Sequence, residues 1–495
     1  MLLTYFAESR PMKLNDVSLF RQACPVAGNW IEAKDHQATT IRNPATGDAL
    51  GAVPDLGAAE TEEAIRAAVI AQKLWAKKTA GERATILKAW HRLMIENIDD
   101  LAMILTLEQG KPLAEAKGEI AYGASFIEWF AEEARRINGE TIPGHQQDKR
   151  ILVLRQPAGV VAAITPWNFP NAMVTRKVGP ALAVGCAVVL KPAPQTPFSA
   201  IALAVLAERA GLPPGLLNIV TGDAAAIGGA LTASPAIRVL TFTGSTRTGE
   251  LLYRQCAPTI KKLGLELGGN APFIVFDDAD LDAAVEGAII AKFRNNGQTC
   301  VCANRLYVQD GVYEAFAAKL ADAVEKLEVG NGLERDVVLG PLIDENAVAK
   351  IDTHIHDAVA KGAGIVSGGK RHALGGLFFE PTILRDVDAS MQVAREETFG
   401  PLAPLFRFRD EQDVIEQAND TEFGLASYFY ARDLSRVFRV AEALEFGMVG
   451  VNTGLVSTAE APFGGVKMSG LGREGSRHGL EEYTELKYVC LGSIS

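Results

Sequence analysis

From about residue 151 onward, short β-rich runs alternate with helical runs, and this alternation constrains the fold more than any other feature of the chain. The segments 186–197, 199–211, 216–222, 225–234 and 237–245 are typical in turn of strand, helix, strand, helix and strand. A second such series begins near residue 265. Strands that alternate with helices form parallel sheets, because the chain must cross back between neighbouring strands. The sequence therefore predicts an α/β protein with two parallel-sheet domains and a ligand cleft between them.

Two other regions follow different patterns. Apolar residues at three- and four-residue spacing predict long helices over 61–78, 81–110 and 114–137. The segments 134–157 and 481–495 fit neither series and are typical of extended strands that need a partner, which another subunit could supply.

The bulk properties exclude several classes of protein. A chain of 495 residues with 48% hydrophobic residues can bury a large core and is expected to form more than one domain. The net charge of −11 argues against a nucleic-acid partner, because phosphate binding needs a basic surface. No apolar run reaches the roughly 20 residues of a membrane span, and the N-terminus is a poor signal peptide. We therefore expect a cytoplasmic protein with no membrane partner, and we expect Met12 rather than Met1 to be the true start.

Six cysteines are too few for a disulfide framework, so reduced thiols are expected. Cys300 and Cys302 lie one residue apart in the loop sequence NNGQTCVCANR. A C-x-C pair with no second pair or nearby His is a weak metal signal, and no metal is predicted. A nucleophilic thiolate needs a partly open, polar site with an activating neighbour. The spacing alone favours neither thiol, and a structural role stays open for both.

Two glycine motifs point in opposite directions. Residues 470–475 match G-x-G-x-x-G, but that fingerprint needs a preceding strand and a following apolar helix, so a turn is the better interpretation. Residues 242–249 (FTGSTRTG) lack the fingerprint, yet they lie between a predicted strand and a predicted helix. Backbone N–H groups at that helix start could hold a pyrophosphate, although a plain turn is equally compatible with the sequence.

Three polar residues follow or end predicted strands. Lys191 comes directly after an apolar strand, where nucleotides bind in parallel sheets. Glu266 lies between two leucines, and an apolar flank raises a carboxyl pKa toward that of a general base. Asn168 lies in a proline-flanked loop and could donate to an oxyanion. On local grounds each could equally be structural.

Several motifs, each weak alone, occur in one order along the chain: ITPWNFP (164–170), Lys191-Pro192, FTGS (242–245), LELGG (265–269), GQTC (297–300), EETFGP (396–401) and PFGG (462–465). Together they resemble the aldehyde dehydrogenase superfamily over nearly the whole chain, from about Phe20. Longer runs, such as EQGKPLAEAKGEI (108–120) and FRNNGQTCVCANRLYVQDGVY (293–313), are similar to those of bacterial NADP-dependent succinate-semialdehyde dehydrogenases.

The resemblance implies a mechanism and a set of catalytic residues. Cys300 is expected to attack the aldehyde, Asn168 to hold the resulting oxyanion, and Glu266 to activate the water that hydrolyses a thioester. Intact Glu266 argues against a CoA-acylating enzyme and a phosphate-activated reductase, and the complete set argues against a non-catalytic protein. Cys302 has no catalytic duty in this scheme; it is either a small structural residue or a redox partner for Cys300.

The resemblance also implies the ligands. NADP is expected to be preferred over NAD, because Pro194 stands where many NAD-preferring relatives carry a glutamate for the ribose 2′-OH. The residues expected to bind the cofactor are Trp167, Asn168, Lys191, Pro194, Gly244, Ser245, Leu267, Glu397 and Phe399. The substrate is expected to be succinate semialdehyde from 4-aminobutyrate degradation, with glutarate semialdehyde or another ω-carboxy-aldehyde as the alternative. Its carboxylate is expected to meet Arg176 and Arg294, with Ser457 and Phe463 as further contacts, since guanidinium forks suit carboxylates.

The same resemblance implies an aldehyde dehydrogenase-like organisation with two Rossmann-like domains and a small β arm. Residues 20–137 and 157–264 are expected to form the NAD(P)-binding domain, and 265–472 the catalytic domain. Residues 138–156 and 473–495 are expected to mediate a homo-oligomer, a dimer or a tetramer, with a homotetramer favoured.

Overall fold

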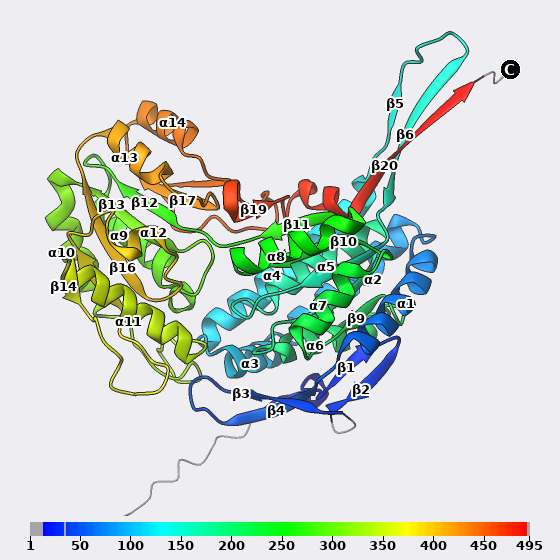
Figure 1. Ribbon diagram of the computed structural model, residues 1–495, viewed down its shortest axis with the longest axis horizontal. Coiled ribbons are helices and arrows are strands. Elements are labelled where there is room, and N and C mark those ends of the chain that lie inside the picture. Colours follow the sequence, from blue (N-terminus) through cyan, green and yellow to red (C-terminus); the bar gives the residue numbers. More distant parts are fainter. Residues whose placement is uncertain (1–12, 34–35, 493–495) are drawn as a thin grey trace, which may run out of the picture.

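Two sheets built mainly of parallel strands dominate a computed structural model that describes residues 13–33 and 36–492, and they confirm the predicted α/β class (Figure 1). Met1 and Met12 lie outside the described residues. The first sheet has the order β19-β11-β10-β7-β8-β9. Its strands are β7 (Val160–Ile164), β8 (Ala187–Lys191), β9 (Leu217–Ile219), β10 (Ile237–Thr243), β11 (Lys262–Glu266) and β19 (Gly470–Leu471). All of its pairings are parallel except that of β11 with β19.

Buried helices cover this sheet. The crossovers are α5 (Ala172–Val184), α6 (Pro197–Arg209), α7 (Ala224–Ala233) and α8 (Thr246–Cys256). Every residue of α5 is buried, including Arg176 and Lys177, as are all but the last two of α6, which explains the nearly continuous apolar sequence of α6. Two hairpins lie before the helices: β1 (Ala23–Val26) with β2 (Asn29–Glu32), and β3 (Ala38–Arg42) with β4 (Ala49–Pro54).

The prediction of a single helix over 81–110 is wrong in one respect, because this segment forms two helices. The N-terminal helices are α1 (Ala58–Trp75), α2 (Ala80–Glu96), α3 (Ile98–Gln109) and α4 (Leu113–Glu133). Asn97 leaves the helical conformation between α2 and α3, and its Nδ2 donates to the Leu93 carbonyl at 2.8 Å. Asp99 and Asp100 then occupy the first turn of α3, where acidic side chains favour a helix start. The apolar residues keep their three- and four-residue spacing across Asn97, so the sequence pattern gives no sign of the break.

The second sheet has the order β14-β15-β16-β13-β12-β17-β18. Its strands are β12 (Ala271–Val275), β13 (Ala303–Gln309), β14 (Gly364–Ser367), β15 (Thr382–Arg385), β16 (Leu402–Phe408), β17 (Ala426–Tyr430) and β18 (Met448–Val451). Its helices are α9 (Leu281–Phe293), α10 (Tyr313–Val324), α11 (Glu345–Ala360), α12 (Gln392–Arg395), α13 (Glu411–Asn419) and α14 (Leu434–Ala443). Only β14 runs antiparallel to its neighbour.

A three-stranded antiparallel arm of β5 (Glu140–Ile142), β6 (Lys149–Pro157) and β20 (Thr484–Gly492) projects from the body (Figure 1). Leu486 and Tyr488 on β20 are 63% and 61% exposed. Strands with large apolar side chains in solvent are typical of a surface that pairs with another chain. The predicted domain boundaries and the homo-oligomer stay predictions. Among the residues the structure describes, no helix is both long enough and apolar enough to cross a bilayer.

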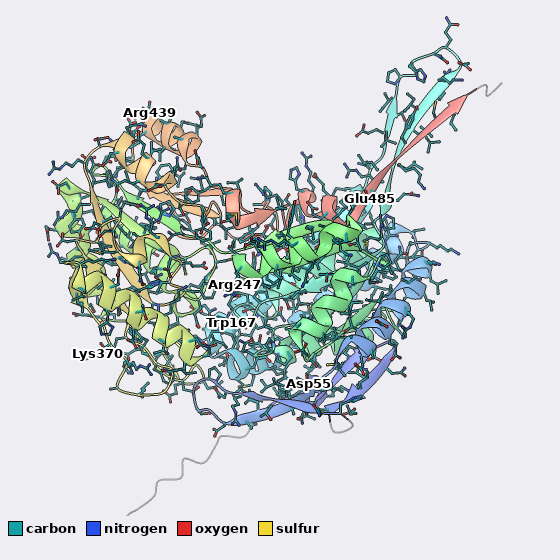
Figure 2. All side chains as sticks on the ribbon, in the orientation of Figure 1. Asp55, Trp167, Arg247, Lys370, Arg439 and Glu485 are labelled. Atoms are coloured by element: carbon teal, nitrogen blue, oxygen red, sulfur yellow. The ribbon has the colours of Figure 1, made fainter. Side chains whose placement is uncertain are left out.

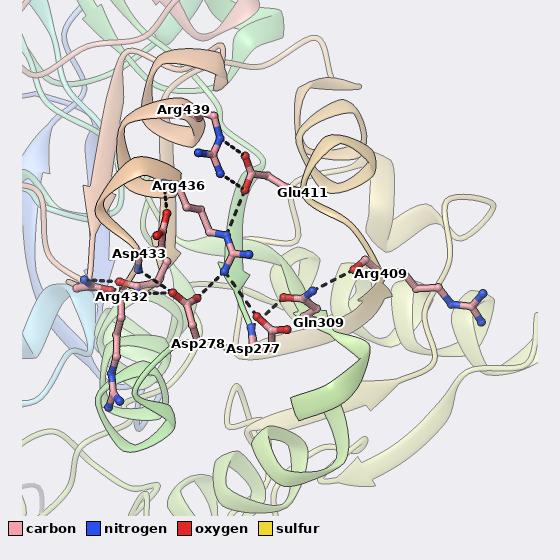
Figure 3. A network of polar contacts seen from close by, with 11 residues as sticks. Asp277, Asp278, Gln309, Arg409, Glu411, Arg432, Asp433, Arg436 and Arg439 are labelled. Carbon is pink, nitrogen blue, oxygen red and sulfur yellow. Dashed lines mark hydrogen bonds and ion pairs between the residues drawn. The ribbon is translucent and has the colours of Figure 1, made fainter.

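A network of ion pairs ties α14 to the start of α13 and to the loop after β12 (Figure 3). Arg436 donates to Asp278 at 2.7 Å and to Glu411 at 3.1 Å, and its guanidinium lies over the Phe276 ring. Hydrogen bonds from Arg439 and Arg436 outweigh burial and lower the pKa of Glu411. Burial acts to raise the pKa of Asp278, but backbone N–H donors and Arg436 lower it overall.

We expect Arg436→Met to lower the free energy of unfolding at pH 7 by about 1–2 kcal/mol, since it removes charge-assisted bonds that are only partly exposed. Because the folded-state pKa values of Asp278 and Glu411 are depressed, this stabilisation exists above their unfolded pKa of about 4 and is lost as pH falls below it. Thermal unfolding at pH 7 and near pH 3 measures both. Arg409→Met is the matched control, because only its carbonyl accepts a network bond and its side chain points away (Figure 3). A deficit of equal size at both pH values contradicts the ionic origin.

Candidate active site

The first sheet opens a crevice where its strand order reverses. The chain passes from β7 to β8 and β9 on one side and then returns to β10 and β11 on the other. Ligands of open parallel sheets bind at this point, beyond the carboxyl ends of the strands. Four predicted segments lie there: Trp167 and Asn168 after β7, Lys191 at the end of β8, Gly244 and Ser245 after β10, and Glu266 and Leu267 at the end of β11.

A cavity of about 270 Å³ joins this crevice to the second sheet. It is lined by twelve of the predicted site residues: Trp167, Asn168, Arg176, Gly244, Ser245, Leu267, Arg294, Cys300, Glu397, Phe399, Ser457 and Phe463. Figure 2 labels Trp167 at the junction of the two halves of the molecule. Glu266, Lys191, Pro194 and Cys302 do not line this cavity. The structure thus brings most of the predicted residues together and leaves four at its margin or elsewhere.

A left-handed turn presents the predicted nucleophile. Asn295, Asn296 and Gly297 have φ values of 51°, 55° and 74°. A Cβ at Gly297 would lie 2.1 Å from the Gly400 carbonyl oxygen, so only glycine fits there. Asn296 Nδ2 donates to the Gly340 carbonyl at 2.7 Å and helps to hold the strained turn. The asparagines and glycine of NNGQTC are therefore required by the backbone that precedes Cys300.

Cys300 is half-buried at the wall of the cavity, and Cys302 is 2% exposed. Burial raises the pKa of the Cys300 thiol to about 12, and the charge of Arg176 only partly offsets this. The resting group is therefore a thiol, and a thiolate needs further help from the ligands or from a base. Cys302 Sγ lies 3.5 Å from the Lys292 carbonyl, which it faces as a weak donor. Both cysteines are free thiols.

Asn168 belongs to a loop that is fixed from two sides. Its Nδ2 donates to the Gln298 carbonyl at 3.0 Å, two residues before Cys300. Its own carbonyl accepts hydrogen bonds from Lys111 Nζ at 2.8 Å and from Asn295 Nδ2 at 3.0 Å. These bonds tie both the side chain and the backbone of Asn168 to the loop that leads to Cys300.

A buried ion pair that the sequence analysis missed supports this loop. Lys111 Nζ lies 2.6 Å from Glu119 Oε2, and both side chains are 1% exposed. Glu119 Oε1 accepts the backbone N–H of Asn171 at 2.9 Å and of Ala172 at 3.2 Å. The lysine also lies 3.8 Å above the centre of the Phe169 ring. Both residues belong to the run EQGKPLAEAKGEI, but no local pattern there indicates a contact with residues 168–172.

Glu266 lies just behind the cavity. Its side chain is buried, and neither carboxyl oxygen has a hydrogen-bond partner among the described residues. Burial, and then the negative charge of Glu474, raise the pKa of Glu266 well above its ordinary value. A carboxyl group whose pKa is raised in this way takes up a proton more readily than an ordinary glutamate, which is a property of a general base.

A second buried charge cluster lies beside Glu266 and also escaped the sequence analysis. Glu474 accepts Arg176 Nε at 2.7 Å and a short hydrogen bond from Lys177 Nζ. Burial acts to raise the pKa of Glu474, but these two cations lower it, so the group is ionised. Arg176 is thus partly neutralised. Arg294, by contrast, forms no ion pair within 4.0 Å among the described residues, and its guanidinium lies 5.4 Å from the centre of the Phe169 ring. Burial raises the pKa of Glu115, and the charge of Arg294 partly offsets this.

The part of the cavity that is lined by Trp167, Gly244, Glu397 and Phe399 is suited to a dinucleotide. Glu397 accepts the Gly269 N–H at 3.2 Å, and burial raises its pKa to about 7. Phe399 packs edge-to-face against Trp167 with ring centres 5.6 Å apart. Thr243 Oγ1 is buried without a partner among the described residues, two residues before Ser245, whose side chain caps the N-terminus of α8. These groups offer donors, an acceptor and flat apolar walls.

Two predicted cofactor residues, Lys191 and Pro194, do not line that cavity. Lys191 is 5% exposed, and its Nζ donates to the Pro192 carbonyl at 3.4 Å. Burial lowers the pKa of Lys191. Pro194 is exposed and lines a separate cavity of about 730 Å³ together with Glu108. Within 13–33 and 36–492, no three His, Cys, Asp or Glu side chains are placed to hold a metal ion.

A thiol, a buried carboxyl group and an amide donor lie together beside the switch point of a parallel sheet, and these are groups that enzymes use in covalent catalysis. The family model "Aldehyde dehydrogenase family" matches residues 30–489, and the chain belongs to that family.

Similar proteins have the same length and fold. A glutarate-semialdehyde dehydrogenase of Pseudomonas aeruginosa is 68% identical over 98% of this chain and 100% of its own. The succinate-semialdehyde dehydrogenase [NADP(+)] GabD of Escherichia coli is 67% identical over 97% of this chain and 100% of its own. The crystal structure of an E. coli NADP dependent enzyme is similar with a TM-score of 0.96 and 66% identity, covering 97% of this chain and 100% of that chain. The expected aldehyde dehydrogenase-like fold is confirmed.

Proposed function

We propose that this enzyme oxidises succinate semialdehyde to succinate, with NADP preferred over NAD as the acceptor. The observation that carries the proposal is Arg294, a guanidinium that forms no ion pair with the described carboxylates and lines the same cavity as Cys300. A half-buried cation of this kind binds an anionic group at the far end of a substrate. The names of the relatives support the substrate class, since both relatives act on aldehydes that carry a carboxylate.

The proposed chemistry assigns one role to each group. The Cys300 thiolate adds to the aldehyde carbon, and the oxyanion accepts hydrogen bonds from Asn168 Nδ2 and the Cys300 N–H, each donor lowering the barrier by about 3–4 kcal/mol. A bound dinucleotide supplies the hydride acceptor that converts this thiohemiacetal into a thioester. Glu266 takes a proton from water, which attacks the thioester and releases the carboxylate and the Cys300 thiol. A CoA-acylating enzyme lacks such a carboxylate, so Glu266 argues against that alternative.

The chain's own residues fit a dinucleotide of this kind. Gly244 and Ser245 line the cavity next to the first turn of α8, whose backbone N–H groups are suited to a pyrophosphate, and Glu397 is the acceptor proposed for a ribose. Trp167, Leu267 and Phe399 provide apolar walls. Pro194 stands where many NAD-preferring relatives carry a glutamate, so this position has no carboxylate to repel a 2′-phosphate, and Lys191 at the end of β8 is proposed to attract it. Higher kcat/KM with NADP than with NAD is the expected result.

Glutarate semialdehyde is the second candidate substrate, favoured by the glutarate-semialdehyde dehydrogenase at 68% identity. It is one methylene longer, and such a difference changes binding by only about 1–3 kcal/mol. Both semialdehydes therefore belong in one substrate panel, measured with each cofactor.

We expect Arg294→Ala to raise KM for succinate semialdehyde far more than for propanal, by roughly 10- to 100-fold, because only the charged substrate loses an ionic partner. Steady-state kinetics of both variants with both aldehydes measures this. Arg92→Ala, which removes an exposed arginine of α2, is the control for a general loss of positive charge. Equal losses for both aldehydes contradict the carboxylate site.

The redox role of Cys302 stays a prediction. Because its thiol is buried and faces the Lys292 carbonyl, a disulfide with Cys300 needs a rearrangement of this loop and should be easily reduced. We expect peroxide to inactivate the wild type reversibly and Cys302→Ala irreversibly, as tested by recovery with dithiothreitol.

The cytoplasmic location, the homotetramer and the part in 4-aminobutyrate degradation are likewise proposed from the resemblance.

A further inference from the structure

One polar group in the cavity has no role in the scheme above. Tyr122 lies on α4 and lines the cavity together with Arg176 and Arg294. Its hydroxyl oxygen is buried and has no hydrogen-bond partner among the described residues. A buried hydroxyl without a partner costs free energy, so its retention calls for an explanation.

The Tyr122 ring is held in one orientation. It packs edge-to-face against Phe126 with ring centres 4.9 Å apart, and the Arg176 guanidinium lies 5.6 Å from the centre of the same Phe126 ring. Tyr122, Arg176 and Arg294 share the wall of this cavity. Burial raises the pKa of Tyr122, and the charges of Arg176 and Arg294 act in the opposite direction. The group stays a neutral O–H donor at any pH at which the enzyme works.

We propose that Tyr122 is a specificity-determining residue, whose hydroxyl donates a hydrogen bond to the terminal anionic group of the substrate between Arg176 and Arg294. The two arginines supply charge, and the hydroxyl adds a directed donor that the protein leaves unpaired until the substrate enters. An uncharged aldehyde offers this donor no acceptor. The site therefore gains selectivity for ω-carboxylate aldehydes beyond what charge alone provides. This inference rests on the proposed function.

The test is Tyr122→Phe, which removes the hydroxyl and keeps the ring. We expect kcat/KM for succinate semialdehyde to fall roughly 10- to 100-fold while that for propanal changes less than about threefold, because a hydrogen bond to a charged acceptor is lost only with the charged substrate. The midpoint of thermal unfolding without ligand should stay equal or rise, since no protein partner is abandoned. Succinate, a non-reactive ligand, should raise that midpoint less in the variant than in the wild type.

Tyr313→Phe is the matched control. That hydroxyl is buried but satisfied, since it donates to the Leu405 carbonyl at 3.3 Å and accepts the Asp386 N–H at 2.9 Å. Its loss should lower the unfolding midpoint and leave the ratio of the two kcat/KM values unchanged. The inference is overturned if Tyr122→Phe leaves that ratio unchanged, or if both aldehydes lose equally. If the wild type itself shows no higher kcat/KM for the semialdehyde than for propanal, the proposed function is contradicted. The inference about Tyr122 is then tested by whether succinate raises the unfolding midpoint less in Tyr122→Phe than in the wild type.

Discussion

Glu266→Gln is expected to produce a single burst of NADPH per site, followed by a steady-state rate about 10²–10⁴-fold below that of the wild type. Glutamine has the size of glutamate but cannot accept a proton. Capture of the aldehyde by Cys300 and hydride transfer therefore proceed, whereas hydrolysis of the thioester stops. Stopped-flow absorbance gives the burst, and mass spectrometry of acid-quenched protein detects the acyl group on the chain.

The pH profile provides an independent check of the same residue. Because burial raises the pKa of Glu266, its basic form is scarce at acidic pH and accumulates as the pH rises. The wild-type kcat should therefore increase with pH over a range above that in which an ordinary glutamate titrates, and Glu266→Gln should lose that rising limb. A variant that shows no burst places Glu266 earlier in the reaction, at deprotonation of the Cys300 thiol.

Removing the buried Lys111–Glu119 pair is expected to lower kcat/KM by roughly 10- to 100-fold through its effect on Asn168. Losing the Asn168 side chain itself should cost about 3–4 kcal/mol, or 10²–10³-fold. The pair acts indirectly, because Lys111 donates a hydrogen bond to the Asn168 carbonyl and Glu119 accepts one from the Asn171 backbone N–H. Its loss loosens the loop without deleting the donor.

A double-mutant cycle separates this positioning from general destabilisation. Lys111→Met and Glu119→Gln are introduced together, since removing one partner leaves a buried charge that can cost about 3–5 kcal/mol of stability. The pair is then measured in the wild type and in Asn168→Ala. We expect less than about a threefold further loss in the Asn168→Ala background, because non-additivity marks residues that act through one another. Equal losses in both backgrounds show that the pair acts elsewhere, and thermal unfolding records the stability change separately.

The α/β class was predictable because strand and helix periods are local properties of the chain. The strand-and-turn segments placed six of the predicted residues at the carboxyl ends of β7, β10 and β11, where ligands of such a sheet bind: Trp167, Asn168, Gly244, Ser245, Glu266 and Leu267. The break at Asn97 was not predictable, because the apolar pattern continued through it. The two N-terminal hairpins were also missed, since their short strands carry no strong alternation.

The supporting residues of the site were hidden for a different reason. Lys111, Glu119 and Tyr122 lie on or beside α4, and Glu474 lies in the turn after β19. Each acquires its role only when distant segments pack together. Lysines and glutamates at such positions are indistinguishable in sequence from solvated helix residues. Only their burial and contacts reveal them, and no motif could have indicated them in advance.

The arm has a consequence for how the chain is made. Strand β6 pairs with β20 along its whole length, from Pro157 opposite Thr484 to Lys149 opposite Gly492. Ribosomes add about 5–20 residues per second, so β6 waits tens of seconds for its partner to be synthesised. During that interval one edge of β6 is open to any extended chain nearby, including its counterpart on a neighbouring ribosome. Nascent chains halted before residue 484 should therefore bind chaperones at the arm, and full-length chains should not.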